Sequence, residues 1–238
     1  MAPRRRQHAI YTDESGGGGE RTLAVAGVAG EARALASLEA GLALALKRHG
    51  LAELKWAQVR TRAPRLLAAE EFLALAQAAR GRGLWLATLT WRQPARRQGP
   101  HPASAGAHAL AHLKPRRDDL ARLGRAYVRL LKAAARAHPP ARWRFCPDQR
   151  TGIDFGSLMV AAGGWRQGWE GFAMQRSGAS PLVQLADLLA GLARFRRDER
   201  RQLAACAAGR ELFGLPARRN RARLALLSRT TALELEAR

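Results

Sequence analysis

The sequence predicts a mixed α/β domain in which helices flank a central sheet. Strand-like runs alternate with helical segments along the 238 residues, and this interleaving favours a mixed sheet with helices packed on it. Apolar residues make up 47% of the chain, which is enough to fill a core. The Ala- and Leu-rich stretches are interrupted by Arg, Lys or Glu, so we expect no membrane span.

The first half of the chain predicts three strands and two helices. Residues 8–13 and 21–28 have strand-like composition on either side of four consecutive glycines, which indicates a hairpin. Residues 31–49 place leucines at helical spacing, and a second helix is predicted from the proline at position 64 to about residue 80. The run GLWLATLTW at 83–91 is typical of a buried strand.

The middle of the chain predicts a long helix and two further strands. Residues 92–104 are rich in Arg, Pro and Gly and are expected to form a loop, and the helix is expected over 105–137. The alternating segment 141–148 predicts one strand and 169–177 the other. The segment 155–163 is ambiguous.

The C-terminal part is predicted to be helical. A helix should begin at Pro181, because Ser180 suits the N-cap and proline suits the first helical position. The segment 199–238 is expected to be amphipathic, helical and rich in Arg. We therefore expect a sheet domain at 1–198 followed by a basic helical C-terminal extension at 199–238.

The charge balance points to a polyanionic partner. The chain has 41 Lys and Arg against 19 Asp and Glu, a formal net charge of +22. Only four basic residues are Lys; a GC-rich coding bias explains Arg over Lys but not the excess of basic over acidic residues. Such an excess attracts nucleic acid and releases its condensed counterions. The arginines expected to contact the phosphate backbone belong to two basic runs: Arg194, Arg196, Arg197, Arg200, Arg201, Arg218, Arg219 and Arg221.

Compartment is indicated by the cysteines and the N-terminus. Cys146 and Cys206 form no metal-spaced pair and no disulfide framework. The basic N-terminus is followed by no apolar segment of signal-peptide type. We expect a reduced cytoplasmic protein.

Four of the 19 acids occupy positions that are unusual for a surface charge. Asp187 lies on the final predicted helix, on a narrow side shared with Gln184 and Gly191, next to a leucine stripe. A lone buried carboxylate is costly unless a cation or hydrogen bonds meet it. The alternative is an exposed Asp187 paired with Arg194. Ordinary charged surface positions are expected for most other acids, Glu39 among them.

The other three candidates follow predicted strands or a helix. Asp13 ends the first strand on the same face as Tyr11, and Asp148 ends the strand 141–148. Strand ends in α/β sheets are where ligand sites gather, although Asp148 could equally be a turn residue after proline. Glu53 follows a helix end, where a solvated Glu beside Lys55 is an equally good explanation.

Carboxylates that converge repel one another unless a cation lies between them. Hard oxygen ligands suit Mg²⁺ or Mn²⁺. Two such ions about 3.5–4 Å apart can activate a water and stabilise the leaving oxygen of a phosphodiester. Acidic residues that bind metal, together with a basic surface that binds nucleic acid, predict that the protein cleaves phosphodiester bonds.

Three stretches together resemble a known bacterial family. IYTDESG near the N-terminus, ELKW after the first helix and SPLVQLADLLAG near the end resemble domain of unknown function 3800, over residues 8 to about 195. That family is similar in fold to ribonuclease H and is expected to carry a divalent-metal nuclease site. The resemblance implies a ribonuclease H-like sheet and two bound ions, Mg²⁺ or Mn²⁺.

The resemblance assigns roles to matching residues. It implies metal ligation and catalysis by four acids, the first of which would bridge both ions: Asp13, Glu53, Asp148 and Asp187. Four more residues match and are expected to support these ligands or the local structure: Glu14, Ser15, Lys55 and Gln184. Three features depart from the family: the Arg-Phe-Cys-Pro before Asp148, a helical insertion between the second and third strands, and the segment from about 199 onward.

The resulting hypothesis is a metal-dependent nuclease that acts on RNA, an RNA–DNA hybrid or DNA, with the first two favoured by the fold alone. One alternative is a module that binds nucleic acid without cutting it. Another is a subunit of a larger defence or mobile-element complex, in which the basic C-terminal helices dock a protein partner or a guide strand.

Overall fold

A computed structural model of the 238-residue chain describes most of the sequence. The described residues are 6–16, 22–59, 64–80, 82–92, 117–138, 142–149, 153–164 and 168–207.

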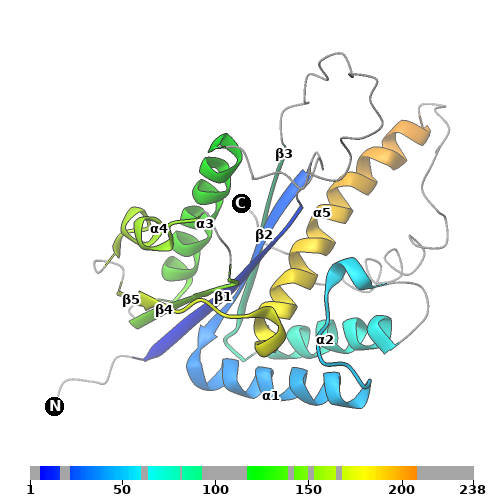
Figure 1. Ribbon diagram of the computed structural model, residues 1–238, viewed down its shortest axis with the longest axis horizontal. Helices are drawn as coiled ribbons and strands as arrows, with labels where there is room; N and C mark the ends of the chain where they lie inside the picture. The colour runs from blue at the N-terminus through cyan, green and yellow to red at the C-terminus, as the bar shows by residue number, and fades with distance from the viewer. Residues whose placement is uncertain are drawn as a thin grey trace, which may run out of the picture.

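The strands form one mixed sheet (Figure 1). Their order in the five-stranded sheet of the described residues is β3-β2-β1-β4-β5. β1 and β2 are antiparallel, as are β2 and β3, whereas β4 runs parallel to β1 and β5 parallel to β4. The strands are β1 (Gln7–Ser15), β2 (Thr22–Glu31), β3 (Trp85–Arg92), β4 (Arg142–Pro147) and β5 (Trp169–Phe172).

Small residues let both faces of β2 be covered. Every residue of β2 except the last is buried, in a segment that reads TLAVAGVAGE. A Cβ atom at Gly27 would lie 3.0 Å from side-chain atoms of both Ile10 and Leu130, and one at Gly30 would lie 2.5 Å from Leu84. A strand buried on both faces explains why this run lacks the polar alternation of a surface strand.

Helices cover the two faces of the sheet. One face carries α5 (Pro181–Ala207), α1 (Ala32–Arg48) and α2 (Pro64–Arg80), and the other carries α3 (Arg117–Ala137) and α4 (Phe155–Ala161) (Figure 1). The predicted leucine stripe of α5 is buried in the first layer, with Leu182, Leu185 and Leu189 fully covered. The second layer is rich in aromatic rings.

Most predicted elements are present. The hairpin is formed by β1 and β2, and the predicted helical insertion between β2 and β3 contains α1, a short 3₁₀ helix (Trp56–Gln58) and α2. The ambiguous segment is α4, which begins after Asp154, whose carboxylate accepts a hydrogen bond from the backbone N–H of Ser157 at 3.1 Å. This order and these strand directions confirm a ribonuclease H-like mixed sheet flanked by helices.

Some predicted element ends need correction, and other predicted segments lie outside the described residues. β5 ends at Phe172, not near 177, and beyond it only an isolated bridge between Asp148 and Gln175 follows. α5 continues without a break from Pro181 to Ala207, across the start of the predicted extension. The predicted loop after β3, the segment 105–116 and residues 208–238 lie outside the described residues. No helix in the described part of the chain is long and apolar enough to cross a membrane.

Candidate active site

Asp13 and Asp148 lie side by side at the carboxyl edge of the sheet. β1 and β4 pair in parallel as far as Thr12 and Pro147, and the N–H of Asp148 donates to the carbonyl of Thr12 at 2.9 Å. The two aspartates are therefore neighbours on strands about 4.8 Å apart. Asp13 is buried, and its Oδ1 accepts a hydrogen bond from the N–H of Glu14 at 2.7 Å.

Strand alternation directs both side chains toward the α5 face of the sheet. Tyr11 and Cys146, two residues earlier on each strand, pack in the layer that contains α5. Ile10 and Phe145 point the other way, into the layer of α3. The alternation of β1 thus agrees with the prediction that Asp13 shares a face with Tyr11.

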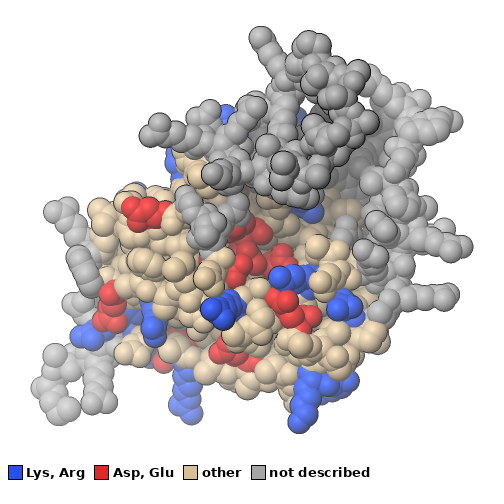
Figure 2. Space-filling view, viewed as in Figure 1, with Lys and Arg blue, Asp and Glu red and all other residues tan. Residues whose placement is uncertain are grey.

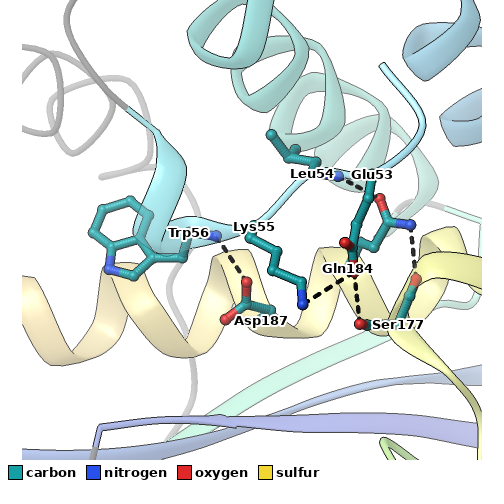
Figure 3. Close-up of polar contacts among 7 residues, drawn as sticks. All are labelled: Glu53, Leu54, Lys55, Trp56, Ser177, Gln184 and Asp187. Atoms are coloured by element: carbon teal, nitrogen blue, oxygen red, sulfur yellow. Dashed lines mark hydrogen bonds and ion pairs between the residues drawn. The ribbon is translucent and has the colours of Figure 1, made fainter. Parts of the chain in front are cut away.

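One side of α5 holds the segment Glu53–Trp56 in place (Figure 3). Gln184 accepts a hydrogen bond from the N–H of Leu54 at 2.8 Å and donates one to the carbonyl of Ser177 at 2.8 Å. Asp187 accepts from the N–H of Trp56 at 2.7 Å.

Gly191 completes this contact. A Cβ atom there would lie 2.1 to 2.5 Å from atoms of the Trp56 indole, so only glycine leaves room for the ring. The spacing of Gln184, Asp187 and Gly191 along the helix thus matches a docking site for the ELKW segment. Gln184 has a structural contact, consistent with the supporting role expected for it.

Glu53 is fixed by two neighbours. Its Oε1 accepts a hydrogen bond from Ser177 Oγ at 2.7 Å and lies 3.3 Å from the ammonium nitrogen of Lys55. Figure 3 shows the Lys55 side chain pointing into the space between Asp187 and the contact of Glu53 with Ser177. The pairing of Glu53 with Lys55 agrees with the ordinary explanation from sequence, but Glu53 is half-buried and not fully solvated.

Burial and mutual repulsion perturb two of the aspartates. Burial, with smaller contributions from the charges of Asp148 and Glu53, raises the pKa of Asp187 to about 6, although the N–H of Trp56 and the ammonium of Lys55 act to lower it. Burial also raises the pKa of Asp148, with a further contribution from Glu53, whereas the N–H of Gln149 and Lys55 lower it. Three carboxylates thus lie within electrostatic reach of one another, and Lys55 is a counter-charge for both aspartates.

Figure 2 shows one group of Asp and Glu side chains near the middle of the face in view, and further acidic side chains scattered toward its left and lower parts. Lys and Arg side chains lie beside the group.

The fit to a metal ion is partial. Among the described residues, no group of three or more His, Cys, Asp and Glu side chains is arranged to hold an ion. Mg²⁺, however, is commonly held by one or two carboxylates together with substrate phosphates and waters. The adjacent carboxylates of Asp13 and Asp148 offer such a pair, so the donor set fits one hard divalent cation.

Glu14 points toward α3, on the other face of the sheet from Asp13, and Ser15 is the last residue of β1. The carboxylate of Glu14 accepts a hydrogen bond from the hydroxyl of Tyr127 on α3. Burial and the charge of Asp13 raise the pKa of Tyr127. Ser15 is buried opposite Ala24 at the end of β1.

The predicted basic residues are only partly within the described structure. Arg194, Arg196 and Arg197 lie half-buried on α5, and the guanidinium of Arg197 donates to the carbonyl and hydroxyl of Thr90 at 2.5 and 2.7 Å. This contact joins α5 to β3. The side chains of Arg200 and Arg201, and the whole of Arg218, Arg219 and Arg221, lie outside the described part of the chain.

The structure adds residues that sequence reasoning missed. Ser177 contacts both Glu53 and Gln184, and nothing in its local sequence distinguishes it. Tyr127 lies on α3, far along the chain from Glu14. In the sequence, only its position on the apolar side of a predicted helix could have indicated that it is buried. Glu39, expected to be an ordinary surface charge, is half-buried, and burial raises its pKa against a hydrogen bond with Ser180.

The fold and the site together define a ribonuclease H-like domain with carboxylates at the carboxyl edge of its sheet. No protein-family model matches the sequence, and a search of curated proteins finds no match either. Among solved structures, the chain is similar to ribonuclease HII in its complex with PCNA from Archaeoglobus fulgidus, with 16% identity, a TM-score of 0.45 and coverage of 98% of this chain and 91% of that one. It is also similar to ribonuclease H2 from Pyrococcus horikoshii OT3, with 10% identity, a TM-score of 0.43 and coverage of 93% and 98%.

Proposed function

We propose that this protein is a divalent-metal-dependent nuclease that hydrolyses phosphodiester bonds of RNA or of an RNA–DNA hybrid. One observation carries the proposal. Negative charge is concentrated at the carboxyl edge of the sheet, where Asp13 and Asp148 are adjacent and Asp187 has a pKa of about 6, on a chain of formal net charge +22.

Asp13 and Asp148 are the residues that would hold the cation, Mg²⁺ or Mn²⁺. Asp187 and Glu53 lie within electrostatic reach of Asp148, and they are the proposed ligands of a second ion. When bound, a divalent cation supplies a more acidic water as nucleophile and stabilises the negative charge of the leaving oxygen.

The remaining contacts position these groups. Gln184 and Asp187 hold the backbone of Leu54 and Trp56, and so fix where Glu53 and Lys55 project. The Lys55 ammonium, whose charge lowers the pKa of both Asp148 and Asp187, would contact a phosphate oxygen of the substrate. The preference for RNA or a hybrid rests on fold analogy, and the net positive charge supports any nucleic acid equally.

The three motifs support membership of domain of unknown function 3800, and the lack of a disulfide framework in the sequence supports a cytoplasmic location. The buried free thiol of Cys146 is compatible with a reducing compartment.

A second candidate is a nucleic-acid-binding subunit that does not cleave. Two observations favour it: no three-ligand group is assembled among the described residues, and Lys55 already compensates the carboxylates. Such a subunit would act in a larger defence or mobile-element complex, with a protein partner that completes the site.

Cleavage assays separate the two functions. End-labelled RNA, DNA and RNA–DNA hybrid are incubated with Mg²⁺, Mn²⁺ or EDTA, using wild type, Asp13→Asn and Asp148→Asn. Glu170→Gln is the matched control, because Glu170 is an exposed carboxylate paired with Arg142 away from the site. Metal-dependent cutting that both aspartate variants lose and the control keeps supports the nuclease. Tight binding without cutting under every condition supports the binding subunit, and cutting that the aspartate variants retain contradicts the site.

A further inference from the structure

A basic cavity lies on the opposite face of the sheet from α5, between the end of β3 and α3. Its volume is about 230 Å³, and Trp91, Arg92, Arg122, Arg125 and Arg129 are among the residues that line it. It shares no residue with the carboxylate site.

Two local patterns bring these arginines together. Arg122, Arg125 and Arg129 follow one another at helical spacing on α3, so they project from the same side of the helix. Arg92 is the last residue of β3, and its carbonyl lies 3.5 Å from a guanidinium nitrogen of Arg122. The helix and the strand end thus supply four guanidinium groups to one cavity.

These guanidinium groups lack acidic partners among the described residues. No described carboxylate lies within ion-pair distance of any of the four, although elsewhere Arg142 pairs with Glu170 and Arg48 with Glu71. Like charges gathered around a cavity repel one another, and a bound anion removes that repulsion. Arginine in particular matches the geometry of phosphate oxygens with paired N–H donors.

The cavity opens at the same edge of the sheet as the candidate active site. Asp13 pairs with Ala26, which pairs with Thr88, and Thr90 and Arg92 follow on β3 in the direction of the strand ends. Two strand spacings amount to about 10 Å, and two to four further residues add about 7 to 13 Å along the strand. Measured within the sheet, the end of β3 beside the cavity therefore lies about 12 to 16 Å from Asp13.

We propose that this cavity binds a backbone phosphate of the nucleic-acid substrate, a few nucleotides from the phosphodiester at the carboxylates. This inference rests on the proposed function, since it names where the same substrate is held. It also predicts that substrates too short to reach the cavity bind weakly.

The test compares two double variants on one helix. Arg125→Gln with Arg129→Gln removes two exposed guanidinium groups from the cavity. Lys132→Gln with Arg136→Gln removes the same charge from exposed positions further along α3, outside the cavity lining. Thermal unfolding of all proteins checks that each variant is folded.

Binding is measured by fluorescence anisotropy with labelled 3-nucleotide and 20-nucleotide RNA, in EDTA and over a range of salt concentrations. The cavity variant should lose about tenfold in affinity for the 20-mer, and its plot of log K against log salt should become shallower by about one to two. The control variant should lose less than threefold, and the 3-mer should bind both variants equally.

Binding of the 20-mer that falls equally in the two double variants would overturn the proposal, because it would show only general charge attraction. Retained affinity in the cavity variant would overturn it too. These results are independent of cleavage. If wild type never cuts but the cavity variant alone loses affinity, the nuclease fails and the phosphate site stands; if wild type cuts and the two variants bind alike, the reverse holds.

Discussion

Replacing Asp187 by Asn tests whether the negative charge of this buried carboxylate destabilises the folded protein. The side chain accepts the N–H of Trp56 and is largely buried, and its charge is opposed by burial and by the charges of Asp148 and Glu53. An asparagine oxygen can accept the same hydrogen bond without the charge. The variant should therefore be more stable than wild type at neutral pH in EDTA.

The size and pH range of the effect follow from the pKa. A rise from 3.8 to about 6 corresponds to at most about 3 kcal/mol in the free energy of unfolding. Because the pKa of Asp187 is raised in the folded state, its protonated form stabilises the fold relative to its charged form. This stabilisation is fully present below about pH 4 and is lost as the pH rises through about 6. The advantage of Asp187→Asn should thus be near zero at pH 4 and approach its maximum above pH 7.

Chemical denaturation of both proteins from pH 4 to 8 measures this difference. Asp154→Asn is the matched control, because Asp154 is fully exposed and its hydrogen bonds from Ser157 lower its pKa. That variant should show no gain in stability at neutral pH. A difference between Asp187→Asn and wild type that does not change with pH, or a less stable variant at pH 7, would refute the burial argument. If the site also holds metal, Mg²⁺ should stabilise wild type more than the variant.

Three further predictions concern the segment held by α5. Gly191→Ala should destabilise the protein by about 1 to 3 kcal/mol, because its Cβ collides with the Trp56 ring; a shift in tryptophan fluorescence and a lower unfolding midpoint check this. Gln184→Leu should cost about 1 to 3 kcal/mol by leaving the N–H of Leu54 buried without its acceptor, and denaturant titration measures the loss. Lys55→Met should raise the pKa values of both neighbouring aspartates, so the acid limb of a cleavage–pH profile should move to higher pH; an unmoved limb would contradict the charge coupling.

Local patterns in the sequence predicted most of the elements. The leucine stripe identified the buried side of α5, and alternation in β1 placed Asp13 on the same face as Tyr11. These predictions succeeded because helical and strand periodicities are properties of neighbouring residues. The ambiguous segment that became α4 was too short for its period to decide between helix and strand.

Contacts between distant segments could not be predicted in this way. The amide of Gln184 meets Leu54 across 130 positions, and Ser177 meets Glu53 across 124. Their residue types are common at surfaces, so only the packing of α5 against the insertion distinguishes them. The same holds for Glu39, whose burial depends on where α1 meets the start of α5.

The sequence by itself determined the class of the fold, the positions of the four candidate carboxylates along their elements, and the positive charge that favours nucleic acid. Tertiary structure alone decided which of those carboxylates share charge, that Lys55 compensates them, and that arginines of α3 meet the end of β3 around one cavity. The reason is physical. Element type depends on nearest neighbours in the chain, whereas the energy of a charge depends on burial and on which other charges the fold brings within a few ångströms.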